Sequence, residues 1–213
     1  MAGSCCNPNP TIDAHNASSP RYRKILWLAL AINLAMFGVE IGAGITSGSV
    51  SLLADAIDFF GDAANYGVTL AVLSMGALWR TRAAVLKASS MMAFGLFVLA
   101  RAAWVFSHGG APEAVTMGTI GLLALLANGS VVVMLYAWRD GNANMRSVWL
   151  CTRNDALGNV AVILAALGVF GTGQAWPDLA VAAVMAGLAL TSGMSVLRQA
   201  RTERRAVTGH TAH

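Results

Sequence analysis

Apolar runs long enough to cross a lipid bilayer limit the possible folds of this chain more than any other feature. A membrane-spanning helix needs about 20 predominantly apolar residues. Of the 213 residues, 56% are hydrophobic and 11% are charged, whereas a soluble domain carries about 25% charged residues. We therefore predict an all-α integral membrane protein with six transmembrane helices, over residues 25–46, 50–78, 84–107, 115–137, 147–170 and 177–197.

The positive charges predict how these helices are oriented. Twelve of the 14 lysines and arginines precede the first span, follow the sixth, or lie where spans 2 and 3 or spans 4 and 5 are joined, with Lys87 in the first turn of span 3. The connections on the opposite side contain none. Because loops rich in lysine and arginine stay in the cytoplasm, we expect both termini there, in a protein of the cell (inner) membrane. The net charge of +4 then reflects topology, and we expect no nucleic-acid partner.

The two ends of the chain are expected to lie outside the membrane domain. Residues 1–20 are polar and predict a disordered cytoplasmic tail, residues 21–197 the six-helix transmembrane domain, and residues 198–213 a short basic cytoplasmic tail. The first tail contains Cys5 and Cys6, which could capture a soft metal as an accessory site, although adjacent cysteines lack the usual ligand spacing.

Three carboxylates interrupt the second predicted span. Asp55, Asp58 and Asp62 are spaced i, i+3 and i+7, so they share one helix face. A charge at the bilayer centre costs at least about 2.5–3.5 kcal/mol, so this face does not meet lipid. These residues either bind cations or are neutralised by the arginines within spans, Arg101 and Arg153. Six carboxylates lie in or near the spans, which is more than two arginines can neutralise.

The fifth predicted span offers a second pair of candidate ligands. Cys151 and Asp155 are spaced i, i+4, as are Asp58 and Asp62, so each pair lies on one helix face. Two such faces could enclose a tetrahedral metal site if they meet. Thiolate and carboxylate ligands suit zinc, cadmium or cobalt better than calcium or magnesium. The alternative for Cys151 is an ordinary buried cysteine.

Two segments carry a resemblance to a known family. Residues 51–62 (SLLADAIDFFGD) and 144–160 (NMRSVWLCTRNDALGNV) resemble the signatures of the cation diffusion facilitators, six-span divalent-metal/proton antiporters. The resemblance implies that the transport-site ligands are Asp58, Asp62, Cys151 and Asp155, with cysteine where the family usually has histidine. It also implies a short form without the cytoplasmic C-terminal domain, and a possible homodimer.

Three further acidic residues are candidates for a proton relay or an access path: Glu40, Asp55 and Asp178. Asp55 lies about one turn closer to the outer surface than Asp58. For Glu40 the alternative is an interhelical hydrogen bond, which is also what we expect of Asn128 and Asn159.

We therefore expect a secondary transporter, not an enzyme, that exports a divalent transition metal in exchange for protons by alternating access. The metal is the transported substrate, and no cofactor is expected. One alternative is a proton-coupled carrier of a small organic cation, with Arg153 paired to Asp155. Another is a membrane-embedded metalloenzyme, which usually needs a histidine or glutamate base, and no histidine lies within a predicted span.

Overall fold

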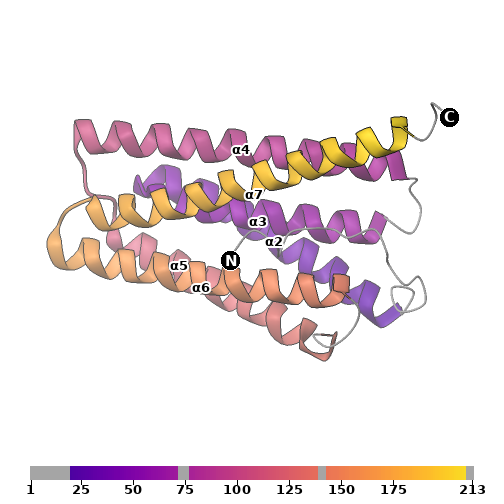
Figure 1. Cartoon of the computed structure of the whole chain (residues 1–213). Helices are drawn as coiled ribbons and strands as arrows, with labels where there is room; N and C mark the ends of the chain where they lie inside the picture. Colours follow the sequence, from indigo (N-terminus) through magenta and orange to yellow (C-terminus); the bar gives the residue numbers. More distant parts are fainter. Residues whose placement is uncertain (1–19, 72–76, 139–142, 210–213) are drawn as a thin grey trace.

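The protein is a bundle of long helices that lie side by side and alternate in direction (Figure 1). The computed structural model describes residues 20–71, 77–138 and 143–209. No strand occurs in these three ranges, which confirms the all-α prediction. The helices are α2 (Pro20–Ser47), α3 (Val50–Ala71), α4 (Ala77–His108), α5 (Ala114–Leu135), α6 (Ala143–Thr172) and α7 (Trp176–Gly209), with a 3₁₀-helix η2 (Tyr136–Trp138) after α5.

Five of these helices contain segments long and apolar enough to cross a membrane: α2, α4, α5, α6 and α7. The chain is therefore an integral membrane protein. α3 carries three aspartates in 22 residues and does not meet this criterion. It is instead enclosed by the other helices, and every residue from Val50 to Ile57 is buried. The count of six spans and the side on which the termini lie stay predictions.

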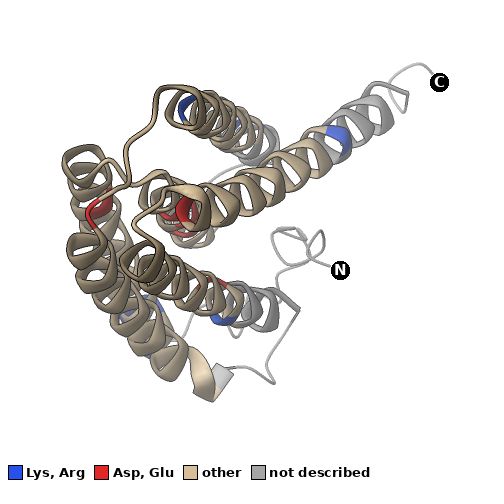
Figure 2. Ribbon diagram, turned by 90° about the vertical axis from the view of Figure 1, so that its left-hand side faces the viewer, with Lys and Arg blue, Asp and Glu red and all other residues tan. Residues whose placement is uncertain are grey.

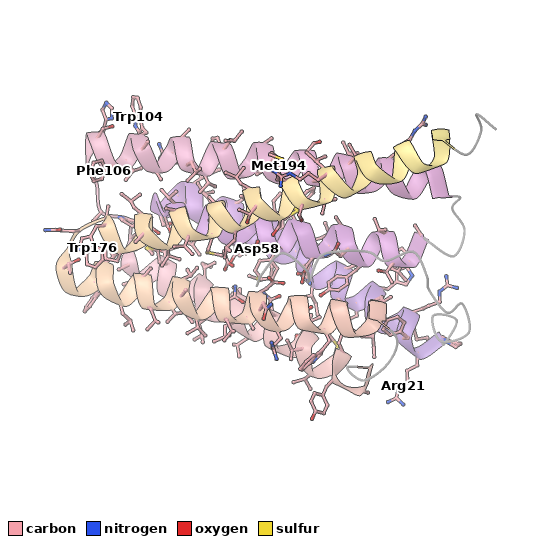
Figure 3. The ribbon with its side chains drawn as sticks, viewed as in Figure 1. Arg21, Asp58, Trp104, Phe106, Trp176 and Met194 are labelled. Carbon is pink, nitrogen blue, oxygen red and sulfur yellow. The ribbon has the colours of Figure 1, made fainter. Side chains whose placement is uncertain are left out.

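The two ends of the bundle differ in chemistry. Figure 3 places Arg21 at one end, and Trp104, Phe106 and Trp176 at the other, with Asp58 between them. Aromatic residues at the end of a membrane bundle are typical of the bilayer interface. The last helix, α7, continues to Gly209, so most of the predicted basic tail over 198–213 extends this helix.

Close approach of α2 and α3 positions the acidic residues of the bundle. Gly48 takes a φ of +72°, a conformation that favours glycine, and this allows the chain to reverse between the two helices. At Gly44 a Cβ atom would lie 2.8 Å from the side chain of Leu53, so a larger residue would force Leu53 to move. The remaining helices pack most extensively as the pairs α4/α7 and α5/α6. Seen along its axis, the bundle has Asp and Glu residues on its central helices and also at one edge (Figure 2).

Candidate functional site

A buried cluster of hydroxyl groups joins Asp62 of α3 to α6. The Tyr66 hydroxyl donates a hydrogen bond to Asp62 Oδ2 at 3.1 Å, and lies 2.6 Å from Thr152 Oγ1. Thr152 Oγ1 is itself 3.5 Å from Asp62 Oδ2. All three side chains are at least 95% buried, with exposures of 5% for Asp62, 1% for Tyr66 and 0% for Thr152. Asp62 is thus held at the interface of the two helices that carry the candidate ligands.

Asp155 lies near this cluster from the α6 side. It is half-buried, and its charge acts on the Tyr66 hydroxyl together with that of Asp62. Asp58 is also half-buried, and its charge acts on Glu40 of α2. Asp58 lies in the middle of the bundle (Figure 3). The structure therefore brings aspartates of α3 and α6 to a common region within the helices.

The cysteine candidates lie outside what the structure describes. Cys5 and Cys6 precede the first described residue, and of Cys151 only the helical backbone is described. Among the described side chains, no three of the histidines, cysteines, aspartates and glutamates form a group that could hold a metal ion. The four-ligand metal site therefore stays a prediction.

A second polar layer links four helices through fully buried side chains. Asn159 of α6 donates from Nδ2 to Asp55 Oδ2 of α3 at 2.7 Å. Asn128 of α5 donates from Nδ2 to Asn159 Oδ1 at 2.9 Å. Exposure of these residues and of Glu40 on α2 does not exceed 2%. The interhelical hydrogen bonds predicted for Asn128 and Asn159 are confirmed.

Glu40 and Asp55 form a facing pair of carboxyl groups in this layer. Their side chains lie within hydrogen-bonding reach of each other. As bare carboxylates, however, Glu40 Oε1, Glu40 Oε2 and Asp55 Oδ1 find no hydrogen-bond donor among the described residues. An ionised carboxylate only accepts, so a hydrogen bond between the two groups requires a proton on one of them. The carboxyl groups of Glu40 and Asp55 are thus placed so that they can share one proton.

Asp178 occupies a different place, at the end of the bundle that carries Trp176. Its Oδ1 accepts hydrogen bonds from Ser49 Oγ at 2.7 Å, Ser51 N at 3.0 Å and Ser51 Oγ at 2.6 Å. Its Oδ2 accepts from Val50 N at 2.8 Å. These donors belong to Ser49, directly before α3, and to the first turn of α3, whose backbone N–H groups have no partners within the helix. The fully buried Asp178 therefore caps α3 from α7.

Arg153 is exposed, and its guanidinium lies over the Trp149 ring, 5.4 Å from the centroid. The structure thus gives Arg153 a cation–π contact. Its pairing with Asp155 in the organic-cation alternative stays a prediction.

Tyr66, Thr152 and the serines that bind Asp178 are polar partners that the sequence analysis did not single out. Tyr66 follows Asp62 by four residues, and Thr152 precedes Asp155 by three, so each extends a helix face that already carried a candidate ligand. The same spacing argument, applied to hydroxyl groups as well as to carboxylates and thiols, would have found both.

Comparison with known proteins finds relatives whose names describe metal-cation antiport and efflux. Two relatives, in Bacillus velezensis and Bacillus subtilis, are each called "Cadmium, cobalt and zinc/H(+)-K(+) antiporter". Both are 26% identical to this chain over 203 residues, which cover 86% of this chain and 63% and 64% of the relatives. The "Metal cation efflux system protein CzcD" of Cupriavidus metallidurans is 25% identical over 175 residues, 76% of this chain and 55% of that protein.

The chain thus spans less than two thirds of the length of these curated relatives. A sequence model of the cation efflux transmembrane domain matches residues 26–203, which include all six described α-helices in whole or large part. This match covers most of the chain and both candidate ligand pairs. The chain belongs to the cation efflux family, the cation diffusion facilitators.

Proposed function

We propose that the protein is a secondary transporter of the cell membrane that exports a divalent metal cation of the zinc, cadmium or cobalt type from the cytoplasm in exchange for protons. The observation that carries this proposal is that the buried hydroxyl groups of Tyr66 and Thr152 join Asp62 of α3 to α6, the helix of Asp155. The names of the relatives, which include cadmium, cobalt and zinc, support the choice of metals.

The transport site in this proposal consists of Asp58, Asp62, Cys151 and Asp155. Carboxylate and thiolate ligands bind zinc at about 2.0–2.3 Å in tetrahedral geometry. Ligands must be deprotonated before they bind metal, so loading of the site releases protons. Alternating exposure of the site to the two sides of the membrane would then exchange metal for protons. A second copy of the chain as a homodimer partner is part of the same proposal.

Purified protein in proteoliposomes tests this proposal directly. An outward proton gradient across the vesicle membrane should drive uptake of zinc, cadmium or cobalt, and collapse of the gradient by an ionophore should stop it. The measurements are metal flux with a trapped fluorescent indicator and proton flux with a pH dye. Proton-driven uptake of organic cations without any metal flux would instead establish the alternative carrier.

Glu40 and Asp55 are the proposed proton-holding pair that accompanies the metal site. Their facing carboxyl groups are fully buried, and the charge of Asp58 acts on Glu40. Three of the four oxygens of this pair find no donor among the described residues, so a doubly ionised pair would be costly here and a proton on the pair offsets one charge. Asp178 is fully hydrogen-bonded, and we assign it a structural role in place of the proton relay.

Glu40→Gln is expected to lower the number of protons exchanged per metal while metal binding persists. The glutamine amide can still donate a hydrogen bond to Asp55, but it cannot release a proton. The measurement is the ratio of proton flux to zinc flux in proteoliposomes, with zinc affinity determined separately by calorimetry.

Asn33→Ala provides the control for this experiment. Asn33 is equally buried on α2 and donates to the backbone oxygen of Ala29 at 2.8 Å, so its loss should leave the ratio unchanged. An unchanged ratio in Glu40→Gln as well would remove Glu40 from the proton pathway.

A further inference from the structure

We infer that Tyr66 and Thr152 are positioning residues that hold Asp62 as a one-oxygen ligand and thereby favour zinc over the larger cadmium ion. This inference rests on the proposed function and adds a determinant of metal preference that lies outside the four ligands. The inference follows from the hydrogen bonds among Tyr66, Thr152 and Asp62, from the burial of these three side chains, and from the contact that they make between α3 and α6.

Two hydroxyl groups meet at one oxygen of Asp62. Tyr66 and Thr152 carry one hydroxyl hydrogen each, and each hydroxyl is placed to donate to Asp62 Oδ2, at 3.1 Å and 3.5 Å. The two hydroxyl oxygens are 2.6 Å apart, and either residue can be the donor in this contact. In both arrangements one hydroxyl donates to Asp62 Oδ2 and accepts from the other, so one hydrogen bond strengthens the next.

Burial strengthens these hydrogen bonds between the hydroxyl groups and Asp62. Tyr66 and Thr152 are 1% and 0% exposed, so water does not compete for Asp62 Oδ2. Tyr66 is also fixed by apolar packing, because its ring belongs to a hydrophobic cluster with Leu26, Val131 and Leu135. A ligand held by hydrogen bonds from rigid neighbours keeps its orientation when metal enters and leaves.

The chain of hydroxyls also crosses between the two halves of the proposed site. Asp62 and Tyr66 belong to α3, and Thr152 belongs to α6, next to Cys151 in sequence and one turn before Asp155. The hydroxyl contact therefore couples the position of Asp62 to the helix that carries the other ligand pair. Loss of either hydroxyl should change the geometry of the site without removal of a ligand.

The preference for zinc follows from which carboxylate oxygen of Asp62 accepts the hydrogen bond from Tyr66. The lone pair of Oδ2 that accepts this hydrogen bond is not available to a metal, which disfavours binding through both oxygens and favours binding through Oδ1 alone. One oxygen per carboxylate suits four-coordinate zinc. A larger cation takes more ligand atoms and gains from carboxylates that bind through both oxygens. Cadmium is larger than zinc, so release of Oδ2 should favour cadmium.

Tyr66→Phe in the full chain tests the inference, with zinc and cadmium as probes. We expect a loss of zinc affinity of about tenfold, the lower end of the range for removal of a hydrogen-bond partner from a metal ligand. The loss of cadmium affinity should be smaller, so the ratio of the zinc to the cadmium dissociation constant rises. Calorimetry on purified protein gives both constants, and competition in proteoliposomes gives the ratio under transport.

Three matched variants separate this role from a general effect on packing. Thr152→Val removes the second hydroxyl at nearly constant volume and should act in the same direction, whereas Thr152→Ser keeps the hydroxyl and should retain the wild-type ratio. Tyr22→Phe removes the same atom from a buried tyrosine of the same hydrophobic cluster and should leave the ratio unchanged.

The outcomes distinguish this inference from the proposed function. Absence of metal binding by the wild-type protein would overturn the proposed function itself. If the wild type binds zinc but Tyr66→Phe leaves the ratio unchanged, or weakens both metals equally, the positioning role of Tyr66 is excluded. A changed ratio in Tyr22→Phe would overturn it as well, because the effect would then belong to the cluster.

Discussion

Alanine in place of Asp62 or Asp155 is expected to abolish metal transport. Each substitution removes one of four proposed ligands and leaves its partners without the charge that binds the cation. Loss of even a hydrogen-bond partner of a ligand lowers metal affinity by about 10–100-fold, so loss of a ligand should lower it by more than about 100-fold. Calorimetry for zinc binding and zinc flux in proteoliposomes measure the two effects.

The double variant sharpens this expectation. Residues that bind one ion act as a unit, so Asp62→Ala combined with Asp155→Ala should be no worse than either single variant. Glu113→Ala is the matched control, because Glu113 is an exposed carboxylate at the start of α5 that accepts from Thr116 Oγ1 at 2.7 Å. Wild-type zinc flux in both single aspartate variants would contradict the proposed transport site.

Asp178→Ala is expected to lower the free energy of unfolding by at least about 3 kcal/mol. A hydrogen bond to a charged group contributes about 1.5–3 kcal/mol, and Asp178 accepts four of them. Removal of the carboxylate also leaves the backbone N–H groups of Val50 and Ser51 buried without their acceptor. The measurement is the unfolding transition in mixed micelles titrated with a denaturing detergent.

Two further variants serve as references for this measurement of stability. Asp178→Asn keeps one acceptor oxygen and should fall between the wild type and Asp178→Ala. Glu113→Ala removes an exposed carboxylate and should change stability by less than about 0.5 kcal/mol. An Asp178→Ala protein as stable as the wild type would show that the cap contributes little to the fold.

The positions of the helices could be predicted from the sequence because the bilayer imposes a length on each apolar run. The run predicted at 115–137 corresponds to α5 (Ala114–Leu135), and the run at 177–197 begins within one residue of α7 (Trp176–Gly209). The far end of α7 was missed, because the criterion was apolar length and the helix continues into a basic segment. Helix propensity and hydropathy are independent properties of a residue, and residues 198–209 form a helix although they are not apolar.

The candidate site was predictable only in part. Spacing placed Asp58 and Asp62 on one face of α3, but it gave no information about which side chains of other helices meet them. The contact of Tyr66 with Thr152 depends on the packing of α3 against α6, which no pattern within one helix encodes. Asp178 was assigned to an access path because its charge was visible in the sequence, whereas its four donors were not.

The Asp178 cap has a consequence for how the bundle can open. Four hydrogen bonds to one buried carboxylate join the start of α3 to the start of α7. Any motion that separates these helix ends must break all four, at a carboxylate that is fully buried. We therefore expect the two ends to move together, and in the proposed transport cycle the opening of the site at this side would fall to the helices around them.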